Sequence, residues 1–186
     1  MDKNKTFIDI GGWIGTTCIY ASRLSKRVLT VEADTQSIKY LRKNCKNNAR
    51  NIECINRAIY KTNGIDITFG KNKHLPNSKL NDSTSHIYLN KTNNGYTIKT
   101  IDLKTLFDDY NVNLKEISLI KVDIEGGEEN ILEDLYKASK RYGFYVFLSF
   151  HLSWWNDKNI DRFDFLSTEQ KTKIKQNPFC SLLLKW

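Results

Sequence analysis

The sequence predicts an α/β fold, a single domain whose mostly parallel sheet carries helices on both faces and ends in an antiparallel edge strand. Short apolar segments alternate with segments of helical periodicity over the first 55 residues, which is typical of right-handed βαβ units. A glycine-rich turn follows the first strand, and residues 117–124 give the strongest strand signal. The length of 186 residues and 40% hydrophobic content suit one domain, residues 1–186, with a buried core.

The N-terminal part predicts five elements in the order strand, helix, strand, helix, strand. Residues 7–10 are apolar and β-branched, and glycines follow at once. Thr35 can cap the second helix, where Ile38, Leu41 and Cys45 keep one face apolar. The five elements are expected at residues 7–10, 16–25, 28–31, from 35 onward, and at 52–55.

The rest of the chain first departs from this pattern and then returns to it. Residues 65–69 alternate as in a half-exposed strand, and residues 96–101 can pair with them. The polar segment between them, about residues 71–94, is predicted as a loop insertion. The remaining elements are strands at 117–124 and 145–150, a helix around Ile131, Leu132, Leu135 and Ala138, a helix at 168–176, and a closing strand at 179–184.

Composition excludes several classes of protein. No apolar run approaches the ~18 residues of a membrane span, and the N-terminus has no secretory apolar region. The four cysteines include no Cys-x-x-Cys pair, which argues against a zinc ribbon or a disulfide framework. We therefore expect a cytoplasmic protein that does not bind membranes.

The net charge of +8 is weak evidence for nucleic-acid binding. Lysine supplies 22 of the 29 basic residues, whereas bidentate phosphate contacts favour arginine. A solvated helical face is the preferred explanation of the basic stretch at residues 23–50.

Asp9 and the glycines after it indicate the ligand. A glycine turn between a strand and a helix lets the backbone approach a ligand closely, here at Gly11, Gly12 and Gly15. Asp9 lies two residues before Gly11, and a carboxylate ~4 Å from a phosphate charge costs about 4 kcal/mol. A donor with an ammonium and a sulfonium, S-adenosylmethionine, fits better than a dinucleotide. The alternative is that Asp9 only caps the helix.

Two further strand ends carry charge. Glu32 closes the second strand, where one carboxylate can accept both hydroxyls of a ribose. Lys121, Asp123 and Glu125 alternate with apolar residues and therefore share a face. Such charges are tolerated in a parallel sheet only when paired or at the open strand end. An ion pair from Lys121 without any catalytic role is the alternative.

The motifs at residues 9–15, 31–34, 57–59, 100–102 and 120–128 together resemble the FkbM-type class I methyltransferases. The resemblance extends from about residue 7 to residue 151, and the Lys-x-Asp-x-Glu-Gly-x-Glu segment is its most specific part. It implies a seven-stranded Rossmann-like sheet, S-adenosylmethionine as methyl donor, and O-methylation of sugars or small natural products. The donor contacts would come from Asp9, Gly11, Gly12, Trp13, Gly15, Glu32, Ala33, Ala58 and Asp123.

The chain departs from the family at three places. Gly12-Trp13 stands where the family usually has Ala-Asn, the first predicted strand begins close to residue 1, and the part after Trp155 matches weakly. The pocket could therefore be more open than in relatives, or completed by a partner.

Transfer to a hydroxyl needs a group that takes its proton. His151, directly after the strand at 145–150, is the first choice because histidine titrates near neutral pH. Asp123 or Glu125 is the second choice, with Lys121 in the same set. A metal shared by Asp123 with another carboxylate has no supporting ligand spacing, so no metal is predicted.

The other candidates are less well placed. His74, His86 and residues 83–85 lie in the polar insertion. Trp154 and Trp155 could stack on a sugar face or pack against the C-terminal helix. Two alternatives to a sugar or small-molecule O-methyltransferase stay open: a methyltransferase acting on RNA or another macromolecule, and a domain that binds the donor without catalysis. A homo-oligomer is compatible with each.

Overall fold

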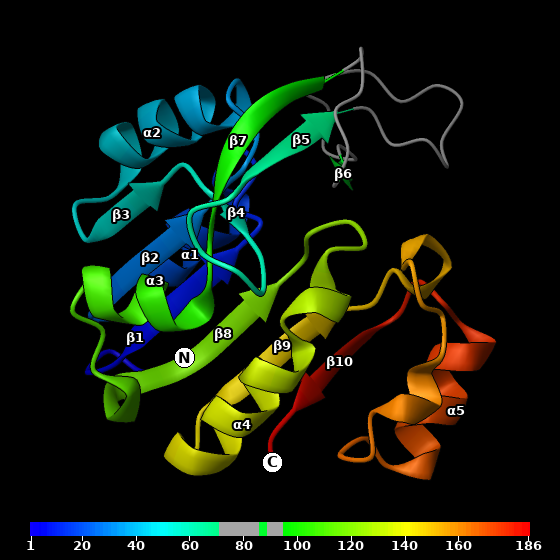
Figure 1. The fold of residues 1–186 in the computed structure, drawn as a ribbon. Helices are drawn as coiled ribbons and strands as arrows, with labels where there is room; N and C mark the ends of the chain where they lie inside the picture. Colours follow the sequence, from blue (N-terminus) through cyan, green and yellow to red (C-terminus); the bar gives the residue numbers. More distant parts are fainter. Residues whose placement is uncertain (71–85, 89–94) are drawn as a thin grey trace.

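The computed structural model describes residues 1–70, 86–88 and 95–186 of the chain. A six-stranded sheet lies at its centre, in the order β10-β9-β8-β1-β2-β3 (Figure 1). In this sheet β1, β2, β3, β8 and β9 run parallel, and β10 pairs antiparallel with β9 at one edge. The strands are β1 Thr6–Ile10, β2 Arg27–Val31, β3 Ile52–Ile55, β8 Ile117–Val122, β9 Tyr145–Ser149 and β10 Ser181–Leu184.

The strand order reverses beside β1. The chain runs outward from β1 through β2 to β3, and then returns to place β8 on the other side of β1. Ile10 pairs with Val31 on one side and with Val122 on the other, so three strands end at the same level. Ligands of open α/β sheets bind at such a reversal, beyond the carboxyl ends of the strands.

A second, four-stranded sheet has the order β4-β7-β5-β6. Its strands are β4 Ala58–Ile59, β5 Asp66–Gly70, β6 His86–Tyr88 and β7 Gly95–Ile101. β5 and β7 pair, as predicted for residues 65–69 and 96–101, and the structure shows that the pairing is antiparallel. Most of the predicted polar insertion, residues 71–85 and 89–94, lies outside the described residues.

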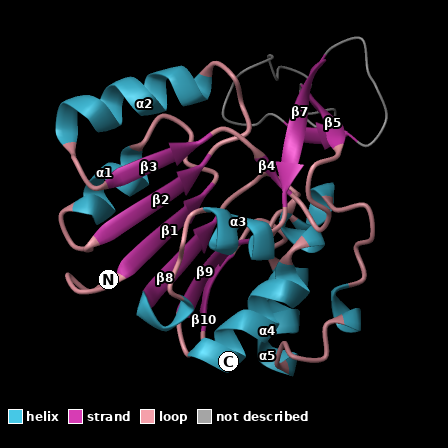
Figure 2. Cartoon of the chain, turned by 60° about the vertical axis from the view of Figure 1, so that its left-hand side comes forward, coloured by secondary structure: helices cyan, strands magenta, loops and turns pink. Residues whose placement is uncertain are grey.

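Helices cover both faces of the main sheet (Figure 2). Phe7 and Val28 pack with α1 and α2 on one face, whereas Ile8 and Leu29 belong to the larger core that contains residues of α3 and α4 on the other. This is the period-two alternation of a strand buried on both sides. The α-helices are α1 Thr16–Ser22, α2 Ser37–Asn48, α3 Leu103–Asp109, α4 Leu132–Tyr142 and α5 Thr168–Gln176. The 3-10 helices are η1 Leu114–Glu116, η2 Glu128–Asn130, η3 Leu152–Trp154 and η4 Ile160–Arg162.

The predicted fold class is confirmed, with corrections in detail. The main sheet has six strands among the described residues and not seven. The cap of α2 is Asp34 and not Thr35, because the Asp34 carboxylate accepts hydrogen bonds from the backbone N–H of Gln36 and Ser37 at 2.9 and 2.6 Å. No sequence pattern predicts α3, whose first turn is capped by Asp102, which accepts a hydrogen bond from the N–H of Thr105. None of the described helices is long and apolar enough to cross a membrane.

Candidate active site

A cavity of about 570 Å³, including its open mouth, lies beyond the carboxyl ends of β1, β2 and β8. The second sheet contributes to its wall through β4 and β5. The lining residues are Ile10, Gly11, Trp13, Val31, Glu32, Ala33, Asp34, Ser37, Arg57, Ala58, Ile59, Phe69, Asp123, Ile124 and Glu125.

The turn after β1 brings backbone close to the cavity. Gly11 has a φ of +86°, and a Cβ there would lie 1.9 Å from the carbonyl oxygen of Asp123. A Cβ at Gly12 would lie 2.0 Å from Oγ1 of Thr30. Only glycine therefore fits at either position, because a side chain would collide with the chain after β8 or with Thr30. Gly15, with a φ of +103°, precedes α1 and does not line the cavity.

Glu32 connects this turn to the end of β2. One of its carboxylate oxygens accepts a hydrogen bond from the backbone N–H of Trp13 at 2.7 Å, and the other accepts one from Asp34 at 2.7 Å. Burial raises the pKa of Glu32 to about 7, although both hydrogen bonds oppose the shift. Trp13 itself is 42% exposed and has a φ of +45°, which is unusual for a bulky residue. The pair forms one wall of the cavity.

Asp9 lies beneath the glycine turn and does not line the cavity. It is fully buried, and no described residue donates a well-directed hydrogen bond to either carboxylate oxygen. Lys121 Nζ forms an ion pair with it at 3.2 Å and donates a hydrogen bond to the carbonyl of Gly11 at 2.8 Å. Burial raises the pKa of Asp9, and the charge of Lys121 opposes that rise. Lys121 thus connects Asp9, the turn and β8, and also lies 3.8 Å from Asp123.

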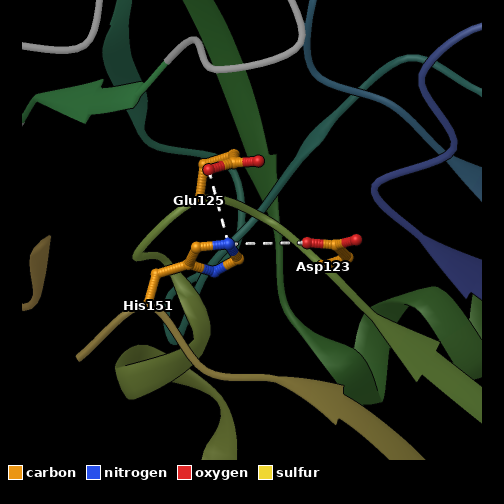
Figure 3. Close-up of side chains that lie close together, drawn as sticks. All are labelled: Asp123, Glu125 and His151. Carbon is orange, nitrogen blue, oxygen red and sulfur yellow. Dashed lines mark ion pairs between the residues drawn. The ribbon is translucent and has the colours of Figure 1, made fainter. Parts of the chain in front are cut away.

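Three predicted catalytic side chains meet at the opposite edge of the cavity (Figure 3). Nε2 of His151 lies 3.4 Å from Oε2 of Glu125 and 3.8 Å from Oδ1 of Asp123. Their potential ligand atoms all lie within 4.8 Å of one another, an arrangement that can hold a metal ion. Glu125 has a φ of +53°, so its backbone is held in the left-handed region. We call Asp123, Glu125 and His151 the acid–histidine cluster.

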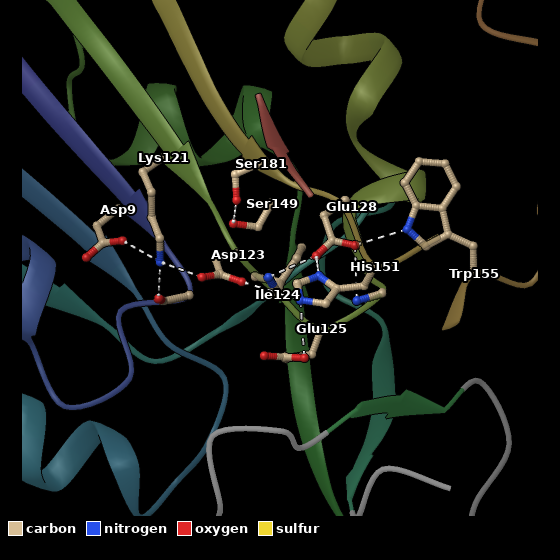
Figure 4. Close-up of polar contacts among 12 residues, drawn as sticks. Asp9, Lys121, Asp123, Ile124, Glu125, Glu128, Ser149, His151, Trp155 and Ser181 are labelled. Carbon is tan, nitrogen blue, oxygen red and sulfur yellow. Dashed lines mark hydrogen bonds and ion pairs between the residues drawn. The ribbon is translucent and has the colours of Figure 1, made fainter. Parts of the chain in front are cut away.

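Glu128 fixes the orientation of His151 through its Nδ1 atom (Figure 4). The fully buried Glu128 carboxylate lies 2.8 Å from Nδ1 of His151 and accepts hydrogen bonds from the backbone N–H of Ile124 and Gly126 and from the indole N–H of Trp155. An ionised carboxylate only accepts hydrogen bonds, so Nδ1 carries a proton and the neutral ring presents its lone pair at Nε2. Burial acts to lower the pKa of His151, but the bond to Glu128 and the charges of Glu128, Glu125 and Asp123 outweigh it and raise that pKa.

Most of the predicted donor-binding residues line the cavity, but some of them do not. Gly11, Trp13, Glu32, Ala33, Ala58 and Asp123 line it, whereas Asp9, Gly12 and Gly15 lie behind it. Prediction missed Asp34 and Phe69 in the wall and the hydrogen bond that Nδ1 of His151 donates to Glu128. Asp34 belongs to the 31–34 motif and Glu128 to the 120–128 motif of the family resemblance. Membership of these motifs was the only sequence feature that pointed to either residue.

The remaining predicted residues are the two tryptophans after His151 and the polar residues of the insertion. Trp155 is buried against the core and donates to Glu128, whereas Trp154 stacks on His151 with ring centroids 5.1 Å apart. His74, the side chain of His86 and residues 83–85 lie outside the described residues.

A profile of the family described as the methyltransferase FkbM domain matches residues 9–172. No curated protein matches the sequence significantly. The fold is similar to the methyltransferase FkbM of Methylobacillus flagellatus, with 18% identity and a TM-score of 0.52 over 80% of this chain and 33% of that one. This chain therefore spans about a third of the length of that protein.

Two other solved structures have comparable similarity. An rRNA methylase from Streptococcus thermophilus is 13% identical with a TM-score of 0.51, covering 90% of this chain and 73% of that one. A Streptococcus mutans protein in complex with SAH is 13% identical with a TM-score of 0.52, covering 91% and 77%. At these identities the likeness shows the fold alone.

Proposed function

The chain belongs to the methyltransferase FkbM domain family, and from this premise we propose that it is an S-adenosylmethionine-dependent O-methyltransferase acting on a hydroxyl of a sugar, a glycan or a small natural product. The observation that carries the proposal is the position of His151 Nε2 beside Asp123 and Glu125. These two carboxylates line the cavity together with Glu32, whereas His151 lies next to it. The proposal treats residues 1–186 as one domain with an insertion at about 71–94.

The donor half of the cavity would be formed by the glycine turn, Glu32, Ala33 and Ala58. Gly11 lines the cavity with its backbone, and no side chain stands between this part of the turn and a ligand. Each oxygen of Glu32 accepts one backbone N–H and keeps lone-pair capacity for a ribose hydroxyl. When bound, the donor supplies an electrophilic methyl group on a sulfonium. SAH in the Streptococcus mutans protein supports this choice of ligand for the shared fold.

Charge supports a cationic donor over a dinucleotide. Glu32, Asp123 and Glu125 all line the cavity, and Lys121 binds the back of the turn. Carboxylates in a partly buried wall favour a positive ligand and oppose a pyrophosphate. Asp9 contributes through Lys121 and not by contact, since it lies behind the wall.

The acceptor half would be the acid–histidine cluster. A hydroxyl bound beside Asp123 would lose its proton to Nε2 of His151 as its oxygen gains the methyl group. Glu128 holds the imidazole in the tautomer that can accept that proton and stabilises the imidazolium that results. Lys121 positions Asp123 from the opposite side, through Oδ2.

Methylation of RNA is the second candidate function, and the net charge of +8 is the observation that favours it. The carboxylates in the cavity wall argue against a phosphate backbone close to the reacting atoms. RNA binding that weakens steeply as salt increases would support this candidate.

The proposal is tested by incubating the protein with S-adenosylmethionine and a panel of activated sugars, and by measuring the addition of one methyl group by mass spectrometry. A methylated product is expected, and His151→Gln should abolish it while donor binding by calorimetry is retained. A protein that binds neither S-adenosylmethionine nor SAH would contradict the proposal.

A further inference from the structure

We propose that the acid–histidine cluster of Asp123, Glu125 and His151 binds a divalent transition-metal ion, and that an ion bound there prevents His151 from accepting a proton. The first half is independent of the proposed function. The second half rests on it, because it assumes that Nε2 is the group that takes the acceptor proton.

The positions of the three side chains suit such an ion. Two ligands about 2.1 Å from a zinc ion at a tetrahedral angle lie about 3.4 Å apart. The distances from Nε2 are 3.4 Å to Glu125 and 3.8 Å to Asp123. The full set spans no more than 4.8 Å, so a small rotation of Asp123, whose side chain is 39% exposed, brings all three within reach.

The hydrogen bond between Glu128 and His151 supports metal binding independently, because Glu128 is not one of the three proposed ligands. Metal-binding histidines donate their second ring N–H to a carboxylate or carbonyl, which fixes the ring and makes the other nitrogen more basic. Nδ1 of His151 lies 2.8 Å from the fully buried Glu128 carboxylate. Three further donors, two of them backbone N–H groups, hold that carboxylate in place. His151 is therefore already held as a ligand would be.

The charge around the ring also favours a cation. Three carboxylates surround the imidazole: Glu128 at Nδ1, and Glu125 and Asp123 at Nε2. Lys121 approaches Asp123 on its Oδ2 side, which leaves Oδ1 directed at His151. Figure 4 shows Lys121 and His151 on opposite sides of Asp123. A divalent ion beside Oδ1 would compensate charge that Lys121 does not reach.

The donor set selects the class of ion. One imidazole nitrogen with two carboxylate oxygens suits Zn²⁺, Mn²⁺ and related ions, whereas Mg²⁺ prefers oxygen ligands and retains several waters. Three protein ligands also leave a position open towards the cavity, which Asp123 and Glu125 line.

Coordination and proton transfer use the same lone pair. When Nε2 forms a bond to the ion, it has no electron pair left for the proton of the acceptor hydroxyl. An ion at this site is therefore expected to inhibit methyl transfer, and its removal by a chelator should restore it.

The test uses the untagged full chain after treatment with a chelator. Calorimetry with Zn²⁺ and electron paramagnetic resonance with Mn²⁺ are expected to give one site per chain. His151→Gln and Glu125→Gln should each weaken binding at least about tenfold, as should the positioning variant Glu128→Gln. Glu133→Gln, a carboxylate on α4 that pairs with Lys137 at the surface, is the matched control and should leave the affinity unchanged. Circular dichroism establishes that each variant is folded.

Two results would overturn the proposal. Ion binding that is equal in the wild type, His151→Gln and Glu125→Gln would place the ion elsewhere. Methyl transfer that requires the ion, and that a chelator abolishes, would overturn the inhibitory role. Calorimetry with S-adenosylmethionine separates these outcomes from failure of the proposed function, because His151 does not line the donor cavity.

Discussion

Oε1 of Glu128 lies 2.8 Å from Nδ1 of His151, and this contact joins the start of η2 to the second residue after β9. The two residues are 23 positions apart in the chain. The same carboxylate accepts the indole N–H of Trp155 at 3.1 Å. One buried side chain therefore organises the loop after β8 and the loop after β9, which together form the acceptor edge of the cavity.

Glu128→Gln is expected to destabilise the protein by about 1–3 kcal/mol. An amide has one acceptor oxygen, so its NH₂ group would face two N–H donors at one end of the buried site and leave them unsatisfied. Urea unfolding measures the change. Glu133→Gln on the exposed surface of α4 removes only a surface ion pair and should change stability by less than about 1 kcal/mol. An equal effect of the two substitutions would contradict the role of Glu128.

Glu32→Ala is expected to weaken binding of S-adenosylmethionine or SAH by about 1–3 kcal/mol, or about 5- to 150-fold. The substitution removes the acceptor for ribose hydroxyls and for the N–H groups of Trp13 and Asp34. Isothermal titration calorimetry measures the affinity. Glu53→Ala, which removes a half-exposed carboxylate on β3, serves as the control. Unchanged affinity in Glu32→Ala would remove the ribose assignment.

Glu32 should also make stability depend on pH. Burial raises its pKa to about 7 in the folded protein, against about 4.3 in an unfolded chain. Between these values the folded state binds more protons than the unfolded state, so this contribution to stability falls as the pH rises from about 4.3 through 7. Urea unfolding at pH 5 and pH 8 should show a smaller loss in Glu32→Gln than in the wild type. The same loss in both proteins would argue against the raised pKa.

Gly11→Ala and Gly143→Ala form a matched pair. Both glycines have a left-handed φ, +86° and +79°, but a Cβ at Gly11 would meet the Asp123 carbonyl at 1.9 Å, whereas one at Gly143 meets nothing within 4 Å. Gly143→Ala should cost about 1–2 kcal/mol from backbone strain. Gly11→Ala should cost clearly more, since the backbone must also move. Equal free energies of unfolding would show that the close approach at Gly11 is relieved without cost.

The order of the βαβ elements and the residues at the ends of their strands follow from local patterns in the chain. Period-two and helical patterns, with glycines between them, are local signals, so Gly11, Glu32 and Asp123 could be assigned to one edge of a parallel sheet before any coordinates were available. Ala33 and Ala58 followed from the family resemblance, and both line the cavity.

The contacts between polar groups depend on the tertiary structure and could not be read from local patterns. Asp9 stands beside the glycines in sequence, yet the strand turns its side chain beneath them towards Lys121. Asp34 rather than Thr35 caps α2 because of where the chain bends after β2. Glu128 meets His151 only because β8 and β9 lie side by side in register. A local pattern specifies which face a side chain is on, but contacts between distant residues depend on how the strands align and on what the packed core leaves room for.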